Sequence, residues 1–333
     1  MTMSEYKKKP IVFSGIRPTG PAHLGNYAGA MRNWVRLQDE YQCYYSIVTW
    51  HALSSEYQNS KVIREYTLEM ANDLLSIGLD PEKCVLFVQS DVKEHAELHL
   101  LLSMITPLPW VERVPTFKDM QKELVDKDIN TYGYLGYPVL QTADIILYKA
   151  EIVPVGEDQA AHLELAREIT RRFNRLFGPV FPEPQILLTE TPRLAGTDGR
   201  KMSKSFGNAI YLKDGPEIIR AKIAPMVTDT RRRRRSDPGE PNDCPVFTLH
   251  NAFVEKEKRQ ELAEACRTAG IGCLDCKNVV IETLIKLLAS YRRRRAELEA
   301  DPGYVRSVLE EGDARARRAA RKTMAAVRDA IGL

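Results

Sequence analysis

Two short segments far apart in the chain contain the residue types from which a nucleotide site could be built. The first is Pro18-Thr19-Gly20-Pro21-Ala22-His23-Leu24-Gly25-Asn26, between an apolar stretch and a helical pattern. Glycines in such a turn let a phosphate or an adenine approach the backbone, and the N–H groups of a helix start attract anions. His23 can donate a hydrogen bond to a phosphate, although a histidine at a helix start can equally be a cap or a packing residue. The Walker and G-x-G-x-x-G patterns are absent, which excludes a P-loop protein and an ordinary dinucleotide binder.

The second segment is Lys201-Met202-Ser203-Lys204-Ser205, preceded by Gly196-Thr197-Asp198-Gly199-Arg200. Two lysines three residues apart in a glycine-flanked loop can close on a polyphosphate as mobile point charges. A surface charge cluster would explain an isolated run of this kind equally well. The presence of both segments in one chain favours a polyphosphate site.

A third group of polar side chains belongs to a helix that Pro138 can begin. Its members recur at i, i+4, i+7 and i+11 and therefore share one helical face: Tyr137, Gln141, Asp144 and Tyr148. Asp144 precedes the apolar run Ile145-Ile146-Leu147, and a carboxylate buried among apolar groups is costly unless it is paired. The sequence therefore predicts a hydrogen-bond donor to Asp144, supplied by the fold or by a ligand. A capping role or an arginine partner would satisfy it as well.

The elements that must position these groups alternate between strands and helices in the first part of the chain. Apolar runs predict buried strands at Ile11–Phe13, Cys43–Trp50 and Cys84–Gln89, and Ser14–Pro21 reads as a loop. Helical periodicity begins near Gly25 and again at Ile63 to Ile77, where Gly78 ends it. This alternation predicts an α/β fold with a doubly wound parallel sheet, whose ligand lies beyond the carboxyl ends of the strands.

The last third of the chain is predicted to be helical. Residues 255–269, 277–295 and 303–331 are rich in Ala, Leu, Glu and Arg. We predict a domain at 1–210 and a helical domain at 211–333, with the last helix packing back on the first domain. Residues 211–333 carry 25 Lys and Arg against 19 Asp and Glu, a net +6, while residues 1–210 carry 23 against 26, a net −3. This asymmetry suits an anionic partner such as nucleic acid on the helical part.

Composition narrows the remaining possibilities. The 333 residues are 44% hydrophobic and 28% charged, with no apolar run near the ~18 residues of a membrane span. The start, Met1 to Pro10, does not lead into the apolar stretch of a signal peptide. The sequence therefore predicts a cytoplasmic protein without membrane association.

Four cysteines are spaced as Cys244-x21-Cys266-x6-Cys273-x2-Cys276. A cytosolic chain has little use for disulfides, and four thiols suit Zn²⁺ or an iron–sulfur cluster. The spacing does not choose between these, and reduced thiols or an adventitious disulfide are the alternative. A metal centre here would be structural.

The two glycine-flanked segments resemble the HIGH-type and KMSKS signatures of class I aminoacyl-tRNA synthetases. Across nearly the whole chain the sequence is similar to the bacterial tryptophanyl-tRNA synthetases. The matching segments are Phe13-Ser14-Gly15-Ile16, Gly25-Asn26-Tyr27, Tyr137-Pro138, Ala143-Asp144-Ile145, Val153-Pro154-Val155-Gly156-Glu157-Asp158-Gln159 and Val227-Thr228-Asp229. The resemblance implies a Rossmann-like catalytic domain, a helical anticodon-binding domain and a homodimer with one tRNA spanning both subunits. It also implies that ATP with Mg²⁺, L-tryptophan and tRNA(Trp) are the substrates.

The resemblance also assigns roles to residues. The implied catalytic residues are His23, Asn26, Lys201 and Lys204. The implied ATP-binding residues are Arg17, Pro18, Thr19, Gly25, Asn26, Gly156, Glu157, Asp158, Leu194, Lys201, Met202, Ser203, Lys204 and Ser205. The implied tryptophan-binding residues are Phe13, Gly15, Tyr137, Gln141, Asp144 and Gln159. In the family Asp144 would accept the indole N–H, and a site built around one such bond can reject an analogue that lacks it by roughly 10⁴- to 10⁵-fold. For Asp158 the alternative is a helix N-cap.

The sequence departs from the family pattern at a few positions. Arg17 stands where many bacterial relatives have an uncharged polar residue, and Gln141 where a Met is common, which suits a divergent second copy of the enzyme. A subset of the family holds a [4Fe–4S] cluster on a similar cysteine pattern, whose first gap is one residue longer. The alternatives are a tyrosyl-tRNA synthetase and a catalytically silent RNA-binding paralogue.

Other charged groups are predicted to be exposed. His95 and His99 read as a solvated helical face without a third metal ligand. Arg231–Arg235 reads as a mobile loop, and the remaining arginines as exposed helix faces that contact solvent or phosphate: Arg292 to Arg295, Arg315, Arg317, Arg318 and Arg321.

Overall fold

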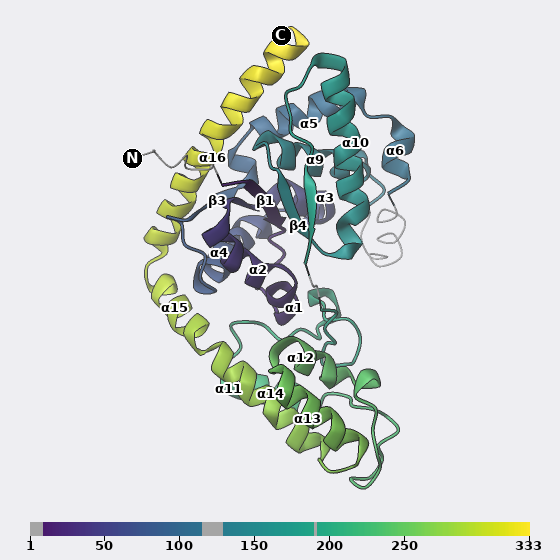
Figure 1. Cartoon of the computed structure of the whole chain (residues 1–333). Coiled ribbons are helices and arrows are strands. Elements are labelled where there is room, and N and C mark those ends of the chain that lie inside the picture. The colour runs from purple at the N-terminus through teal and green to yellow at the C-terminus, as the bar shows by residue number, and fades with distance from the viewer. Residues whose placement is uncertain (1–8, 115–128, 190–191) are drawn as a thin grey trace, which may run out of the picture.

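The computed structural model describes residues 9–114, 129–189 and 192–333; the start of the chain, on which the signal-peptide prediction rests, lies largely outside them. A parallel sheet with the strand order β3-β2-β1-β4-β5 forms the centre of the upper part of the molecule in Figure 1. Its strands are β1 (Ile11–Ile16), β2 (Gln42–Ile47), β3 (Cys84–Val88), β4 (Ile152–Val155) and β5 (Gln185–Leu188). The predicted α/β fold with a doubly wound parallel sheet is confirmed.

Helices connect successive strands on both faces of this sheet. Between β1 and β2 the chain forms α1 (Leu24–Asn26), a π-helical stretch (Tyr27–Met31) and α2 (Arg32–Glu40). Between β2 and β3 it forms α3 (Thr49–Glu56), a 3-10 turn (Tyr57–Asn59) and α4 (Val62–Ser76). The longer crossover to β4 contains a 3-10 turn (Gln89–Asp91), α5 (Glu94–Ile105), α6 (Leu108–Glu112), α8 (Tyr132–Leu135) and α9 (Tyr137–Leu147). A 3-10 turn (Glu157–Gln159) and α10 (Ala160–Phe177) lead to β5.

The strand order reverses between β1 and β4. The chain leaves β1 toward β2 and β3 on one side, and returns to β4 and β5 on the other. At such a switch point the two adjacent loops diverge and leave a crevice at the carboxyl ends of the strands. We therefore expect the ligand to bind beyond Ile16 and Val155, the last residues of β1 and β4.

Two strand boundaries differ from the sequence prediction. Strand β1 continues through Ser14–Ile16, a segment predicted as loop, because a central strand finds parallel partners for these residues in Tyr45–Ile47. Strand β2 instead ends early, since Thr49 and Trp50 already belong to α3. Tertiary pairing therefore outweighs the local glycine signal in the first case.

The remainder of the chain is helical, as predicted. It forms α11 (Pro216–Ile223), α12 (Pro245–Phe253), α13 (Lys256–Arg267), α14 (Cys273–Leu287), α15 (Ala289–Ala300) and α16 (Pro302–Ile331). The segment predicted as one helix at 277–295 is divided into α14 and α15 at Leu288. Helices α11 and α12 were not predicted; each is short and begins with a proline in its first turn.

Helix α16 runs along the outside of the sheet, as the yellow helix of Figure 1 shows. Its buried residues Ala316, Ala320 and Met324 belong to the same apolar cluster as Phe87 of β3. Gly312 permits this approach, because a Cβ there would lie 1.8 Å from the Leu86 carbonyl oxygen. Among the described residues, no helix has both the length and the apolar character needed to cross a membrane.

The arginines of α16 contact the first part of the chain. Arg315 donates to the Pro81 carbonyl at 2.7 Å, and Arg317 donates to the Asp91 carbonyl at 2.7 Å. Arg321 pairs with Glu94 at 3.2 Å, whereas Arg318 is exposed. The prediction of freely solvated faces is therefore wrong for Arg315 and Arg317, because the helix lies flat on the fold.

Candidate active site

Residues 17–20 and 156–159, which the resemblance assigns to ATP binding, lie at the carboxyl ends of adjacent strands. β1 leads into Arg17–Gly20, and β4 leads into Gly156–Gln159. Arg17 and Glu157 are exposed, while Pro18 is buried. Gly156 and Gln159 occupy the cap positions of the 3-10 turn and of α10, and position 158 lies within that 3-10 turn. The structure thus brings residues 17–20 and 156–159 to the switch point of the sheet.

His23 caps the helix that follows it. Its Nδ1 accepts hydrogen bonds from the N–H groups of Gly25 at 3.0 Å and Asn26 at 3.3 Å. The Asn26 Oδ1 in turn accepts from the His23 N–H at 3.1 Å, which completes a capping box. Burial, and secondarily the nearby Lys204 cation, lower the pKa of His23 to about 4. The ring is therefore neutral at pH 7, and because Nδ1 accepts, its proton is on Nε2.

This arrangement requires a glycine at position 25. A Cβ there would lie 2.8 Å from Cε1 and 2.9 Å from Nδ1 of the His23 ring. The close approach lets His23 serve as a cap and keep its Nε2–H available as a donor. The two alternatives raised by the sequence, a cap and a phosphate ligand, are therefore compatible.

The first segment is also bonded to the region after the second one. The Leu24 N–H donates to the Ile210 carbonyl, and the Leu212 N–H donates to the Ala22 carbonyl, both at 2.9 Å. The Lys204 ammonium donates to the Gly20 carbonyl at 2.7 Å and lies 3.4 Å from the Thr19 hydroxyl. The structure therefore joins the two glycine-flanked segments directly.

The two lysines of the second segment have different environments. Burial lowers the pKa of Lys204 to about 8, and the nearby Asp73 raises it less than burial lowers it. Lys201 is exposed and pairs through its backbone with Ala195. Of these two lysines, Lys204 is the one whose side chain is bonded to the first segment in the described part of the chain.

The loop around Lys201 is held by a residue that the sequence did not single out. The buried Asn208 accepts the Ser203 N–H at 2.8 Å and donates to the Lys201 carbonyl at 3.1 Å and to Asp198 at 2.7 Å. Buried Met202 donates its N–H to the carbonyl of Leu194, also buried, at 2.9 Å. Ser205 is exposed.

The fold supplies the donors that Asp144 was predicted to need. Asp144 is 1% exposed. Its carboxylate accepts from His95 Nδ1 at 2.7 Å, from His51 Nε2 at 3.0 Å and from Gln89 Nε2 at 2.7 and 2.8 Å. Burial alone would raise the pKa of Asp144, but His95 and His51 outweigh it and lower the pKa to about 2. The Asp144 carboxylate is therefore ionised at neutral pH.

His95 and His99 are not on a solvated face. His95 is fully buried and lies 2.7 Å from the Tyr148 hydroxyl through Nε2. Because a carboxylate only accepts, the Nδ1 of His95 donates to Asp144. His99 lies on the wall of a cavity of about 420 Å³. Their exposure was predicted wrongly because α5 is covered by α9, α10 and α16.

The other residues predicted to bind tryptophan surround this carboxylate unevenly. The Phe13 ring stacks on Tyr148 with centroids 5.7 Å apart, and the Tyr137 hydroxyl is 2.6 Å from His162 Nε2. The His51 ring contacts Tyr137 edge-on at 6.0 Å, so His51 links Tyr137 to Asp144. The cavity lies against this side of α9. Six of its wall residues are Trp50, Leu53, Tyr57, His99, Tyr137 and Leu140.

Gly15, Gln141 and Gln159 complete the set predicted to bind tryptophan. Gly15 is exposed, and a Cβ there would lie 2.7 Å from a Val48 methyl group. Gln141 is half-buried one turn after Tyr137, and Gln159 is half-buried before α10.

The four late cysteines gather between α12, α13 and α14. Burial, followed by the charges of Cys244, Cys266 and Cys273, raises the pKa of Cys276 to about 12. Arg232 donates to Cys266 Sγ at 3.8 Å, and Cys276 Sγ lies 3.3 Å from His250 Nε2. In the described part of the chain, no group of three or more His, Cys, Asp or Glu side chains is arranged to hold a single metal ion.

Sequence reasoning missed Gln89, His51 and Asn208, and it misjudged His95. Gln89 follows directly after β3, and His51 lies in the first turn of α3, four residues after the end of β2. Polar residues at the carboxyl ends of parallel strands are therefore the signal that could have indicated them.

Comparison with known protein families shows the class of protein to which this chain belongs. Residues 5–289 match the family model of the class I tRNA synthetases for tryptophan and tyrosine (W and Y). The chain therefore belongs to this class of aminoacyl-tRNA synthetases.

Individual relatives narrow the assignment. The tryptophan–tRNA ligase of Thermotoga maritima is 50% identical over 324 residues, which cover 97% of this chain and 99% of the relative. That of Aquifex aeolicus is 42% identical over 392 aligned residues, which cover 97% and 99%. The crystal structure of tryptophanyl-tRNA synthetase from Campylobacter jejuni with ADP and tryptophan has a TM-score of 0.84 at 33% identity, and covers 97% of this chain and 100% of that one. Within its class the chain belongs to the tryptophan–tRNA ligase family, which confirms the resemblance seen in the sequence.

Proposed function

We propose that this chain activates L-tryptophan with ATP to tryptophanyl-adenylate and then transfers the tryptophanyl group to tRNA(Trp). The observation that carries this proposal is Asp144, a buried ionised acceptor whose partners His51 and Gln89 lie beyond the carboxyl ends of β2 and β3. An acceptor of this kind suits a ring N–H rather than a purely apolar side chain.

The activation step needs positioning more than proton transfer. The tryptophan carboxylate is ionised at pH 7, so it attacks the α-phosphate of ATP without a general base. The bond that breaks joins the α- and β-phosphates, and pyrophosphate leaves with the electron pair. Mg²⁺ bound to ATP supplies charge neutralisation of the phosphates. Catalysis by the protein is then mostly orientation and stabilisation of developing charge.

His23, Asn26, Lys201 and Lys204 are the groups proposed to stabilise that charge. The neutral His23 ring would donate through Nε2, because its Nδ1 is already an acceptor. Lys204 lies against the first segment and can exchange its bond to the Gly20 carbonyl for a phosphate oxygen. The exposed Lys201 would reach the phosphates only when its loop moves toward them.

Backbone groups and smaller side chains would complete the ATP site. The remaining candidates are Arg17, Pro18, Thr19, Gly25, Gly156, Glu157, Asp158, Leu194, Met202, Ser203 and Ser205. Arg17 is exposed just after β1, and its positive charge contributes to the lowered pKa of Lys204.

Recognition of the indole requires one donor to leave Asp144. His95 is held at both ring nitrogens and is fully buried, so it is the fixed partner. His51 lies in the first turn of α3 and contacts Tyr137, which lines the cavity, so it is the donor that the indole N–H would replace. Phe13, Gly15, Gln141 and Gln159 would border the ring and the amino group. Phenylalanine would be rejected because it would leave the carboxylate without this partner.

We also propose that Cys244, Cys266, Cys273 and Cys276 hold a structural [4Fe–4S] cluster. Four thiolates are the ligand number that such a cluster needs, and the charges of the other three cysteines contribute to the raised pKa of Cys276, which places the four thiols near one another. Purified protein should contain about four irons per chain and absorb visible light. Stoichiometric zinc without iron would contradict this assignment.

The tRNA and the second subunit would use different surfaces. The helical part has the net charge of +6 that suits an anionic partner. Some apolar side chains of α5, α6 and α8 are exposed and suit a homodimer contact, with Met104 at 71% and Tyr132 at 73% exposure. Leu100 and Leu108 belong to the same exposed set.

ATP–pyrophosphate exchange tests the function directly. Exchange should be stimulated by L-tryptophan and not by L-tyrosine. Stimulation by tyrosine alone would identify a tyrosyl-tRNA synthetase, and no exchange with either amino acid would indicate a silent paralogue.

A further inference from the structure

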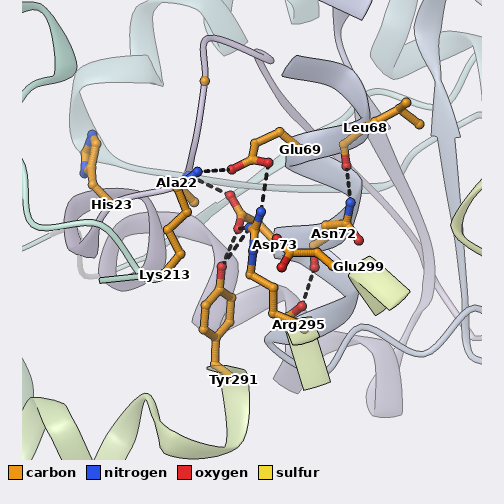
Figure 2. A network of polar contacts seen from close by, with 12 residues as sticks. Ala22, His23, Leu68, Glu69, Asn72, Asp73, Lys213, Tyr291, Arg295 and Glu299 are labelled. Atoms are coloured by element: carbon orange, nitrogen blue, oxygen red, sulfur yellow. Dashed lines mark hydrogen bonds and ion pairs between the residues drawn. The ribbon is translucent and has the colours of Figure 1, made fainter. Parts of the chain in front are cut away.

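A buried carboxylate connects the first glycine-flanked segment to the helical part of the chain. Asp73 lies on α4 and is inaccessible to solvent. Its Oδ2 accepts the Ala22 N–H at 2.6 Å, and its Oδ1 accepts from the Tyr291 hydroxyl and from Arg295 Nη1 of α15. Figure 2 shows Asp73 between these two sides, with Ala22 and His23 on one and α15 on the other.

The surrounding charges hold this contact in place. Arg295 also donates to Glu69 at 2.8 Å and to Glu299 at 2.7 Å, and Lys213 pairs with Glu69 at 2.7 Å. Arg295 was predicted to be exposed with its neighbours, but it is 4% exposed because α15 packs against α4. A buried arginine with three carboxylate partners is oriented far more narrowly than a surface one.

The hydrogen bond that Asp73 accepts from Ala22 helps to set the position of the first segment. Ala22 immediately precedes His23. Its carbonyl is held by Leu212, and its N–H is held by a side chain rather than by a neighbouring strand. Since His23 Nδ1 is fixed by the N–H groups of Gly25 and Asn26, a shift of Ala22 moves His23 Nε2 with it.

We propose that Asp73 is a positioning residue for the ATP step, and that with Tyr291 and Arg295 it makes the geometry of the first segment depend on how α15 docks. This inference rests on the proposed function for its kinetic consequence, although ATP binding can be measured without it. Tyr291 and Arg295 are four residues apart on one face of α15, so any rotation or sliding of that helix changes both bonds to Asp73 together.

The electrostatics of Asp73 agree with this role. Burial raises the pKa of Asp73, and the bonds from Tyr291, Arg295 and Ala22 each oppose that rise. The net direction is a raised pKa, the contacts from α15 favour the ionised form, and an ionised carboxylate binds the Ala22 N–H more strongly than a neutral one.

Variants of the full-length chain test the proposal. Tyr291→Phe removes one donor and Arg295→Gln removes the cation, while Asp73→Asn removes the acceptor charge. ATP–pyrophosphate exchange should be measured per active site, counted by adenylate burst, together with the ATP affinity of each variant by calorimetry. We expect kcat/KM for ATP to fall about 3- to 10-fold for Tyr291→Phe and about 10- to 100-fold for the other two, as the loss of neutral and charged hydrogen bonds implies. The KM for tryptophan should change less than about 2-fold, since Asp144 has separate partners.

Two controls separate positioning from general stability. Asp229→Asn removes a nearly buried carboxylate that accepts from the Glu240 N–H and from Arg231, so it resembles Asp73 while its partners lie wholly in the helical part. It should lower the melting temperature without changing kcat/KM for ATP. Arg295→Lys, which keeps the charge, should recover part of the loss seen in Arg295→Gln. The double variant Asp73→Asn/Arg295→Gln should be no worse than the worse single variant.

The proposal is overturned if the Asp73 variants only melt earlier and keep wild-type kcat/KM for ATP per active site. It is also overturned if the KM for tryptophan rises as much as that for ATP, because the effect would then be global. If the wild-type chain shows no tryptophan-dependent exchange, the proposed function fails. The ATP affinities still decide the role of Asp73, which would be refuted by equal affinities in the wild type and the variants.

Discussion

Replacement of Asp144 by Asn should weaken both tryptophan use and folding stability. The substitution keeps the shape of the side chain but removes the charge and places an N–H₂ group among the donors of His51, Gln89 and His95. The lowering of the Asp144 pKa from 3.8 to about 2 corresponds to roughly 2 kcal/mol of stabilisation at neutral pH. One donor left unsatisfied costs about 1–3 kcal/mol more. The free energy of unfolding should therefore fall by about 3–5 kcal/mol in urea denaturation at pH 7.

The effect of Asp144→Asn on the free energy of unfolding should depend on pH in a defined direction. A carboxyl group with a lowered folded pKa contributes stability that is present above about pH 4 and is lost as the pH falls toward 2. Wild-type and Asp144→Asn proteins should thus differ most above pH 4 and become more similar toward pH 2. A difference in unfolding free energy that stayed constant over this range would refute the assigned charge.

Kinetics test the role of the same carboxylate in recognition. A charge-assisted hydrogen bond contributes about 1.5–3 kcal/mol, so kcat/KM for tryptophan should fall about 10- to 100-fold in ATP–pyrophosphate exchange, with the KM for ATP unchanged. Asp229→Asn serves as the matched control, since it loses a partner of Arg231 outside the site. Unchanged tryptophan kinetics in a folded Asp144→Asn protein would refute the proposed recognition of the indole.

Further predictions concern the remaining parts of the site. Because the pKa of Lys204 is lowered to about 8, kcat/KM for ATP should decline above pH 8 as the ammonium loses its proton, and Lys204→Arg should abolish that decline in a pH–rate profile. Gly25→Ala should reduce kcat about 10- to 100-fold, because the new Cβ would displace the His23 ring; an unaltered rate would show that this ring position is unimportant. Met104→Glu should convert a dimer to monomers in sedimentation velocity, and no change in mass would move the dimer contact elsewhere. Cys276→Ser should remove bound iron and lower the melting temperature, whereas a protein that keeps four irons would have its ligands elsewhere.

The sequence by itself determined the features that depend on neighbouring residues. Apolar runs between breaker residues indicated β1, β2 and β3, and the spacing of Tyr137, Gln141 and Asp144 placed these side chains on one helix. These signals are local, because helix and strand periodicity require only a few consecutive residues. The same holds for the two glycine-flanked segments, whose composition suits a nucleotide before any tertiary contact is known.

The tertiary structure decided which polar groups are buried and with what partners. His51, Gln89 and His95 come from three separate elements and meet at Asp144 because the segments after β2 and β3 start at one end of the sheet and α5 packs against α9. Arg295 looks like its exposed neighbours in sequence, yet it pairs with Asp73 across 222 positions. The physical reason is that burial and pairing depend on which face of a helix another element covers, and that is set by packing over the whole chain rather than by local periodicity.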